Sequence, residues 1–199
     1  MILDWSSHTE AMQTGSKRNA ELTRQKLLAA ATEEFAANGL AGGRIDRIAA
    51  AAGISKPMLY AYFGDKEALF AAALAQEVLA ATSRDRFDPD DLEGYAGRTY
   101  DLLVERPRLW RLLTWHHLER GLDVLMLPEG QDILRDKRDA IAAAQAEGWL
   151  TSEFEPMEVV RLVAALSQLW CMAEPARDDV EHQARRATIK RAVARLLLK

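Results

Sequence analysis

The stretch IDRIAAAAGISKPMLYAYF, from Ile45 to Phe63, decides the fold because it predicts two short helices joined by a glycine turn. Its first half carries apolar residues at helical spacing up to Gly53, which can adopt the left-handed conformation that ends a helix. Ser55 is a good N-cap for a second helix. Pro57 falls in the first turn of that helix, where its missing N–H has no intrahelical partner to lose. The pattern is typical of a helix-turn-helix.

The second of these helices, residues 55–63, is predicted to have one buried and one exposed face. Leu59 and Phe63 lie four residues apart and are expected to point into the core. The outward positions are Lys56 at the helix start, Pro57, Met58 and Ala61 in the middle, and Tyr60 and Tyr62 at the flanks. Such a face suits the major groove of DNA. Its apolar groups can contact thymine methyls, and its hydroxyls and lysine can reach phosphate or guanine. The alternative, in which both tyrosines belong to the core, stays open.

The rest of the chain also predicts helices and a single fold class. Of the 199 residues, 49% are hydrophobic and 28% are charged, which suffices for a packed core, and strand-forming runs are scarce. We expect an all-α protein of about nine helices, with an N-terminal helix-turn-helix domain and a C-terminal helical bundle. The expected helices are residues 19–38, 44–52, 55–63, 65 to beyond 79, 92–105, a segment after Pro107, 127–147, 157–172 and 180–198.

Cysteine content and hydropathy favour a cytoplasmic protein without a membrane span. The single cysteine, Cys171, excludes an intramolecular disulfide and fits a reducing compartment, and its apolar surroundings predict a plain buried thiol. The longest apolar run is well short of a membrane span, which needs about 20 residues. Residues 1–18 lack the features of a signal peptide and are predicted to form a flexible arm.

Charge is unevenly distributed along the chain, with a mildly basic N-terminal part followed by an acidic remainder. The net charge is −4, but residues 16–66 carry eight Lys/Arg against five Asp/Glu, and the residues from Glu67 onward carry 18 against 23. A protein that coats DNA non-specifically would be far more basic. An enzyme is also disfavoured, because the sequence shows no nucleophile–base spacing and no glycine-rich phosphate loop. Adjacent His116 and His117 point about 100° apart on a helix, so we expect neither a metal site nor a cofactor.

The segment TRQKLLAAATEEFAANGLAGGRIDRIAAAAGISKPMLYAYFGDKEALFAAAL, Thr23 to Leu74, resembles the DNA-binding domain of the tetracycline-repressor (TetR) family. The shared pattern is an amphipathic first helix ending in F…NG, then I…IA..AGIS, then LY.YF..KE.L. The resemblance implies an all-helical homodimer with a three-helix head and a larger body that holds a small-molecule pocket. It also implies that an effector bound in the body releases a palindromic operator. The alternative is a helical ligand-binding protein or enzyme whose head is vestigial.

The resemblance places DNA contacts on particular residues of the head. Lys56, Pro57 and Met58 fall where family members read bases, Tyr60 and Tyr62 where they touch bases or phosphates, and Lys66 where a phosphate is bound. One departure concerns the start of the second helix, where the family commonly has a Thr/Ser pair and this chain has Gly43–Arg44. Arg44 can supply a phosphate contact by charge. The expected DNA-binding set is therefore Arg44, Ser55, Lys56, Pro57, Met58, Tyr60, Tyr62 and Lys66.

We assign residues 19–66 to a DNA-binding head and residues 67–199 to an effector-binding and dimerisation body. The body resembles the family only loosely. Its candidate pocket residues are Trp110, Trp115, His116, Met126 and Trp170, although tryptophan and methionine at helical spacing also suit a core. One stripe on residues 157–172 consists of Val159, Leu162, Val163, Leu166 and Trp170, and a second consists of Val160, Ala164, Ser167 and Cys171. Two apolar faces on one helix predict core on one side and a partner on the other. We expect the dimer to form through the last two helices as a four-helix bundle.

Overall fold

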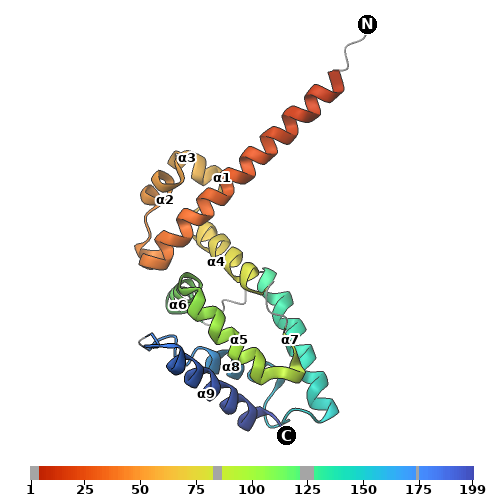
Figure 1. The fold of residues 1–199 in the computed structure, drawn as a ribbon. Helices are drawn as coiled ribbons and strands as arrows, with labels where there is room; N and C mark the ends of the chain where they lie inside the picture. The colour runs from red at the N-terminus through yellow and green to blue at the C-terminus, as the bar shows by residue number, and fades with distance from the viewer. Residues whose placement is uncertain (1–4, 83–86, 122–127, 174) are drawn as a thin grey trace. The chain divides into compact units, whose positions relative to one another are not determined.

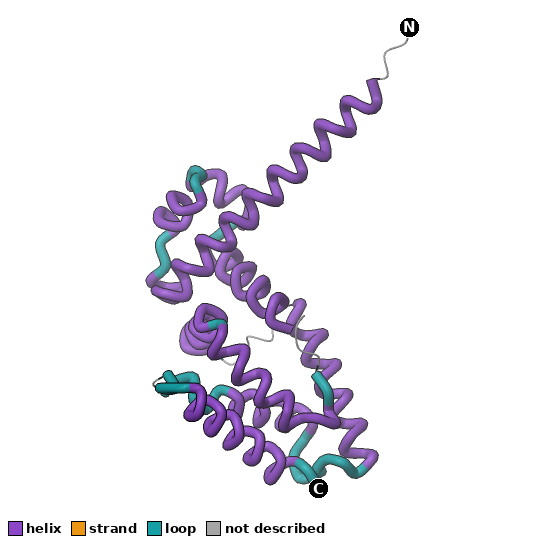
Figure 2. The backbone as a smooth tube through the Cα atoms, viewed as in Figure 1, coloured by secondary structure: helices purple, strands orange, loops and turns teal. Residues whose placement is uncertain are grey.

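The computed structural model describes residues 5–82, 87–121, 128–173 and 175–199, and within these ranges the chain is built of helices joined by short loops (Figures 1 and 2). The one β-type contact among these residues is an antiparallel bridge between Leu150 and Leu198. The all-α prediction is therefore confirmed. No helix in the described part of the chain is long and apolar enough to cross a membrane.

The chain divides into two compact units, residues 1–76 and 77–199, which are described separately. The first unit, the head, contains α1 (Trp5–Gly42), α2 (Ile45–Ala52), α3 (Lys56–Phe63) and the beginning of α4 (Lys66–Thr82). Helices of eight residues such as α2 and α3 are marginal alone, so they depend on packing. The fully buried side chains that hold the head together come from all four helices: Leu27, Leu28, Ala31, Phe35, Ile48, Leu59, Leu69 and Phe70.

Helix α1 is longer than the sequence predicts at its N-terminal end. We expect a flexible arm over residues 1–18, whereas the structure continues the helix back to Trp5. No proline interrupts this segment, and Ala11, Met12 and Gln13 are good helix formers. At the other end the prediction is confirmed, because Gly39 adopts φ 72° and ψ −178° and regular helix stops at the NGL segment.

The second unit, the body, contains a 3₁₀ turn η1 (Pro89–Asp91) and helices α5 (Leu92–Glu105), α6 (Pro107–Arg120), α7 (Pro128–Glu147), α8 (Pro156–Ser167) and α9 (Asp179–Leu197). In Figure 1, α5 lies beside α9 and α8, and these helices share a core with α7. The core consists of Leu92, Ala96, Tyr100, Ile141, Ala144, Leu150, Val159, Val163, Ile189, Val193 and Leu197. The predicted bounds of α5 are confirmed, while α8 ends at Ser167 rather than at residue 172.

A charged cluster ties α5 to α9 at the edge of this core. Asp101 accepts hydrogen bonds from the Arg186 guanidinium at 2.7 Å and contacts His182 Nε2 at 2.9 Å. The His182 ring stacks on Tyr100, with centroids 4.9 Å apart. A Cβ atom added to Gly97 would lie 3.2 Å from the Arg186 guanidinium carbon, so the glycine lets this side chain lie against α5.

The two apolar stripes predicted on residues 157–172 are not separated into a core face and an exposed face. Ser167 is fully buried, and its hydroxyl donates to the Val163 carbonyl at 2.8 Å. Val160 and Cys171 pack against the body core, as does Leu166. The chain turns after Ser167, and this turn brings Cys171 onto the core. The exposed residues of α8 and the turn after it are instead Glu158, Arg161, Ala164, Ala165, Leu169, Met172 and Ala173.

Candidate nucleic-acid interface

The helix-turn-helix in the head has the local geometry that its sequence predicts. Ile45, Ile48, Ala49 and Ala52 are the buried residues of α2. Gly53 ends the helix with φ 70° and ψ 32°, a left-handed conformation that costs little without a Cβ atom. Ser55 then caps α3, because its hydroxyl accepts the Met58 backbone N–H at 3.4 Å.

The turn presents one face of α3 to solvent. Leu59 is fully buried, whereas Met58 is 42% exposed and Tyr60 is 44% exposed. Lys56, Pro57 and Ala61 are also exposed, and Tyr62 is half-buried. The predicted orientation of the helix is confirmed, and the tyrosines do not both belong to the core.

Phe63 is less buried than the sequence predicts. Its ring is half-buried, and the Arg24 guanidinium of α1 lies over it at 5.5 Å from the centroid. Phe63 therefore seals the edge of the head core under a cation–π contact instead of lying at the centre. The buried aromatic pair of the head is instead Phe35 and Phe70, whose rings meet edge to face at 5.2 Å.

Lys56, the expected base-reading lysine, forms an ion pair that sequence analysis did not predict. Its ammonium contacts Asp46 Oδ1 in the first turn of α2, and both side chains are 54% exposed. The hydrogen bond from Lys56 lowers the pKa of the Asp46 carboxyl. The pair joins the two helices across their exposed surface. Because nine residues separate Asp46 from Lys56, no local spacing pattern in the sequence indicates the pair.

The unusual start of α2 is explained by contacts with α1. Arg44 does not cap the helix with its own side chain, and its backbone N–H donates to Glu34 Oε1 at 3.0 Å. Glu34 also lies 3.7 Å from the Arg47 guanidinium. A carboxylate of α1 therefore accepts the backbone N–H of the N-cap residue, although it does not take over the contact that an N-cap hydroxyl makes with the second or third residue of the helix, and the Arg44 side chain stays exposed.

Gly43 is required by close packing. A Cβ atom at this position would lie 2.5 Å from Phe35 Cδ1 and 2.9 Å from the Gly39 carbonyl oxygen. Any residue with a side chain would need the Phe35 ring or the α1 backbone to move. Nothing in a local sequence pattern indicates this contact, because Phe35 lies on α1 eight residues before Gly43.

Lys66 has a structural contact as well as its expected role at DNA. Its ammonium donates to the Ala41 carbonyl at 3.0 Å and so ties the start of α4 to the end of α1. Asp65 caps α4 by accepting the Ala68 N–H at 2.7 Å. An ammonium has three donors, so one bond to Ala41 leaves capacity for a phosphate oxygen.

The candidate pocket residues of the body that the structure describes come from α6 and from the turn after α8. Trp110, Trp115 and His116 are half-buried on α6, whereas Trp170 packs against the body core beneath the Arg185 guanidinium, 5.1 Å from its ring. The Trp170 indole Nε1 is shielded from solvent and has no hydrogen-bond partner among the described residues. Met126 lies outside the described residues.

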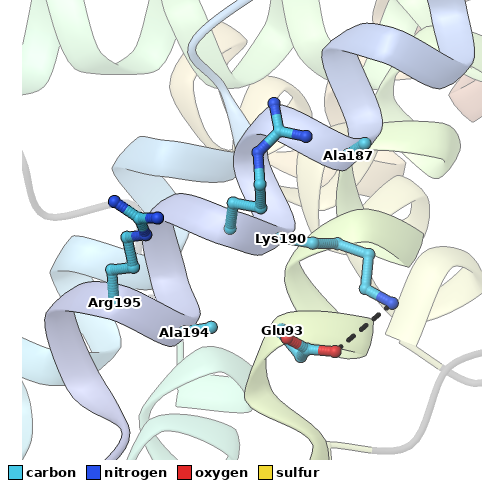
Figure 3. Close-up of a pocket in the computed structure, with 6 residues that line it drawn as sticks. Glu93, Ala187, Lys190, Ala194 and Arg195 are labelled. Atoms are coloured by element: carbon cyan, nitrogen blue, oxygen red, sulfur yellow. Dashed lines mark ion pairs between the residues drawn. The ribbon is translucent and has the colours of Figure 1, made fainter.

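A groove of about 450 Å³ lies elsewhere, between α5 and α9 (Figure 3). Its lining is Glu93, Ala187, Lys190, Arg191, Ala194 and Arg195, and Glu93 pairs with Lys190 at 3.5 Å. None of the predicted pocket residues lines it. Among the residues that the structure describes, no group of three or more His, Cys, Asp or Glu is arranged to hold a metal ion.

Cys171 has the properties of a packing residue. Its side chain is half-buried against the body core. Desolvation by burial raises the pKa of the thiol to about 11, so the reactive thiolate is scarce at neutral pH. The predicted inert thiol agrees with this environment.

Family models match segments in both units of the chain. Residues 27–73 match the family model described as bacterial regulatory proteins, tetR family. Residues 91–195 match the model described as tetracyclin repressor-like, C-terminal domain, and so more than half of the chain. The chain belongs to the TetR family. It is a DNA-binding transcriptional regulator with a helix-turn-helix head.

Curated relatives from several bacteria belong to the same class. The HTH-type transcriptional repressor SCO4008 of Streptomyces coelicolor is 34% identical over 188 residues, which cover 90% of this chain and 97% of the relative. The HTH-type transcriptional repressor NicS of Pseudomonas putida is 28% identical and covers 79% of this chain and 80% of its own. The HTH-type transcriptional regulator RutR of Escherichia coli is also 28% identical and covers 85% and 84%.

Solved structures agree with the TetR assignment. SCO4942 from Streptomyces coelicolor superposes with a TM-score of 0.73 at 38% identity, over 88% of this chain and 98% of that one. AibR, solved in complex with isovaleryl coenzyme A and operator DNA, superposes with a TM-score of 0.66 over 87% of this chain and 97% of its own. At 16% identity, AibR supports the fold alone.

Proposed function

We propose that the chain acts in the cytoplasm as a dimeric repressor that binds a palindromic operator through α3 and is released by a small-molecule effector. In this proposal it is a regulator without catalytic activity. The observation that carries the proposal is the exposed face of α3, where Met58 and Tyr60 stay accessible beside the fully buried Leu59. An apolar residue half open to solvent on a recognition helix suits contact with a thymine methyl.

The eight predicted residues divide into two roles in this proposal. Lys56, Pro57 and Met58 project from the first turn of α3 and contact base edges. Tyr60 and Tyr62, with Arg44, Ser55 and Lys66, contact phosphate or sugar and fix the register of the protein on the duplex. The exposure of Arg44 supports its role, since its guanidinium is accessible beside the α2 N-terminus.

Selection of operators from randomised duplex DNA tests the function and the base-reading roles together. The parent protein should enrich a palindromic sequence, because a two-fold symmetric dimer presents two recognition helices. Met58→Ala and Lys56→Ala should each alter the preferred base at one position of each half-site. If both variants select the parent's sequence with unchanged discrimination, the face has been misassigned. If the parent enriches no sequence, the proposed function is wrong.

The dimer is proposed to form through the exposed surfaces of α8 and α9. Leu166 packs against the body core, so a charge at Leu166 would damage the fold as well as the interface. Ala165 is exposed on α8 and is a cleaner site for a test. Ala165→Arg should reduce the mass measured by light scattering from that of a dimer to that of the 22.2 kDa monomer while the melting temperature of the head stays unchanged. A parent protein that is monomeric at micromolar concentration would exclude this dimer.

The effector is proposed to bind in the body near Trp170. The support is the Nε1 donor of Trp170, which is shielded from water and unpaired among the described residues, because such a donor gains a hydrogen bond when a ligand supplies an acceptor. Trp110, Trp115, His116 and Met126 remain candidates for the same pocket.

A further inference from the structure

We propose that Asp46 is a specificity-determining residue, which holds Lys56 away from the phosphates of non-operator DNA and releases it only to a base edge of the operator. The inference rests on the proposed DNA-binding role of α3 and assigns a new function to a residue of α2. It concerns the discrimination between operator and other DNA, and not the affinity for DNA in general.

The position of the ion pair is the first observation. Asp46 lies in the first turn of α2 and Lys56 is the first residue of α3, so the pair spans the exposed side of the turn. Pro57 and Met58, the neighbours of Lys56, are exposed on the same helix. Asp46 therefore places a negative charge at the edge of the surface that faces DNA.

The second observation is that the pair does little for the fold. Both side chains are 54% exposed, and an ion pair between solvent-exposed groups is weak. The N-terminus of α2 is already served by Glu34, which accepts the Arg44 N–H and lies beside Arg47. Asp46 interacts favourably with the dipole of α2 from its first turn, a small contribution for a surface group, and its carboxylate lowers the attraction of this surface for DNA whether or not it pairs with Lys56.

The consequence for non-specific DNA follows from counterion release. A cation that neutralises a phosphate adds about 0.9 to the slope of log affinity against log salt. Lys56 is already neutralised by Asp46, so in a non-specific complex it releases no counterion. Binding to arbitrary sequences is weaker by the contribution of one phosphate contact.

The consequence for the operator is different because the acceptor there is directional. Guanine O6 and N7 together offer a lysine ammonium two acceptors in the major groove, which repay the loss of a weak exposed pair. The contact between Lys56 and the base is then made with or without Asp46. Removal of the Asp46 charge should therefore strengthen non-specific binding more than operator binding.

The experiment measures the affinity of full-length protein for two duplexes over a range of salt. One duplex carries the sequence that the parent selects from randomised DNA, and the other is a scrambled duplex of equal composition. Asp46→Asn should bind the scrambled duplex roughly 5- to 10-fold more tightly at 0.1 M salt, with a salt slope larger by about 0.9. Its affinity for the selected duplex should rise less, so that the ratio of the two affinities falls several-fold.

Two controls separate this role from general electrostatics. Glu21→Gln removes a negative charge from an exposed residue of α1 that contacts Gln25, and it should leave the affinity ratio at the parent's value. In a Lys56→Ala background, Asp46→Asn should no longer change the ratio, because the proposed effect acts through Lys56. Melting curves establish that each variant is folded.

The inference is overturned if Asp46→Asn leaves the ratio unchanged or raises it. It is equally overturned if the effect persists without Lys56, or if Glu21→Gln lowers the ratio as much. A parent protein that selects no sequence would instead refute the proposed DNA-binding function, so the two failures are distinguishable.

Discussion

The contact between Gly43 and Phe35 allows a stability prediction to be worked out from distances. Carbon atoms in good contact lie about 3.5–4.0 Å apart, whereas a Cβ at Gly43 would lie 2.5 Å from Phe35 Cδ1 and 2.6 Å from Cε1. The ring would have to move by roughly 1 Å. It is fully buried and packs edge-on against Phe70, so this movement has no free space to enter.

Gly43→Ala should therefore destabilise the head by about 1–3 kcal/mol, the usual cost of overpacking a core. For a domain of 60–100 residues, each kcal/mol lowers the melting temperature by about 4–8 °C. The neighbouring Gly42 provides a matched control. A Cβ there meets only Asn38 Cβ at 3.4 Å, an ordinary contact, so Gly42→Ala should be neutral or stabilising by about 0.5–1 kcal/mol.

Thermal unfolding followed by circular dichroism and calorimetry would measure both variants. A Phe35→Leu background should reduce the cost of Gly43→Ala, because a smaller side chain leaves room for the added methyl group. If Gly43→Ala melts at the same temperature as Gly42→Ala, the Phe35 ring moves aside without cost. The close contact would then not explain why glycine occupies this position.

Four further outcomes are expected. Lys66→Met should weaken binding to all DNA sequences about equally and lower the salt slope by about 0.9, and a change in sequence preference at an unaltered slope would contradict the phosphate role. Leu59→Ala should destabilise the head by about 2–5 kcal/mol, whereas Met58→Ala, at an exposed site, should leave the melting temperature nearly unchanged. Alkylation of Cys171 should be slow at pH 8 and accelerate only towards pH 11, while protein unfolded in urea should react as an ordinary thiol. Because the folded thiol keeps its proton, the free energy of unfolding should fall as the pH rises above the unfolded pKa of about 8.5, and a rise would contradict the burial effect.

The head could be predicted in detail because its geometry is set by neighbouring residues. Gly53, Ser55 and Pro57 specify the turn and the start of α3 through local conformation and capping. The exposure of Met58 and the burial of Leu59 follow from helical periodicity. These features need no knowledge of the rest of the chain.

The contacts that the sequence did not predict are long-range or depend on tertiary packing. The cap that Glu34 provides to Arg44 joins two helices, and the pair between Asp46 and Lys56 depends on how α2 crosses α3. The end of α8 at Ser167 follows neither a glycine nor a proline, and packing of Trp170 on the body core accompanies it. The pocket residues stay a prediction, because tryptophan at helical spacing suits a core as well as a ligand site.

The capping of α2 by a carboxylate from another helix has an evolutionary consequence. Several backbone N–H groups at the α2 N-terminus lack an intrahelical partner. Glu34 accepts that of Arg44, whereas a hydroxyl at position 44 would accept that of residue 46 or 47, a cap that contributes about 0.5–2 kcal/mol. Because the two acceptors serve different N–H groups, Thr or Ser at position 44 should occur among related sequences with or without an acidic side chain at position 34. A lineage could therefore gain or lose the hydroxyl at position 44 while Glu34 keeps the Arg44 N–H paired beneath the DNA-binding surface.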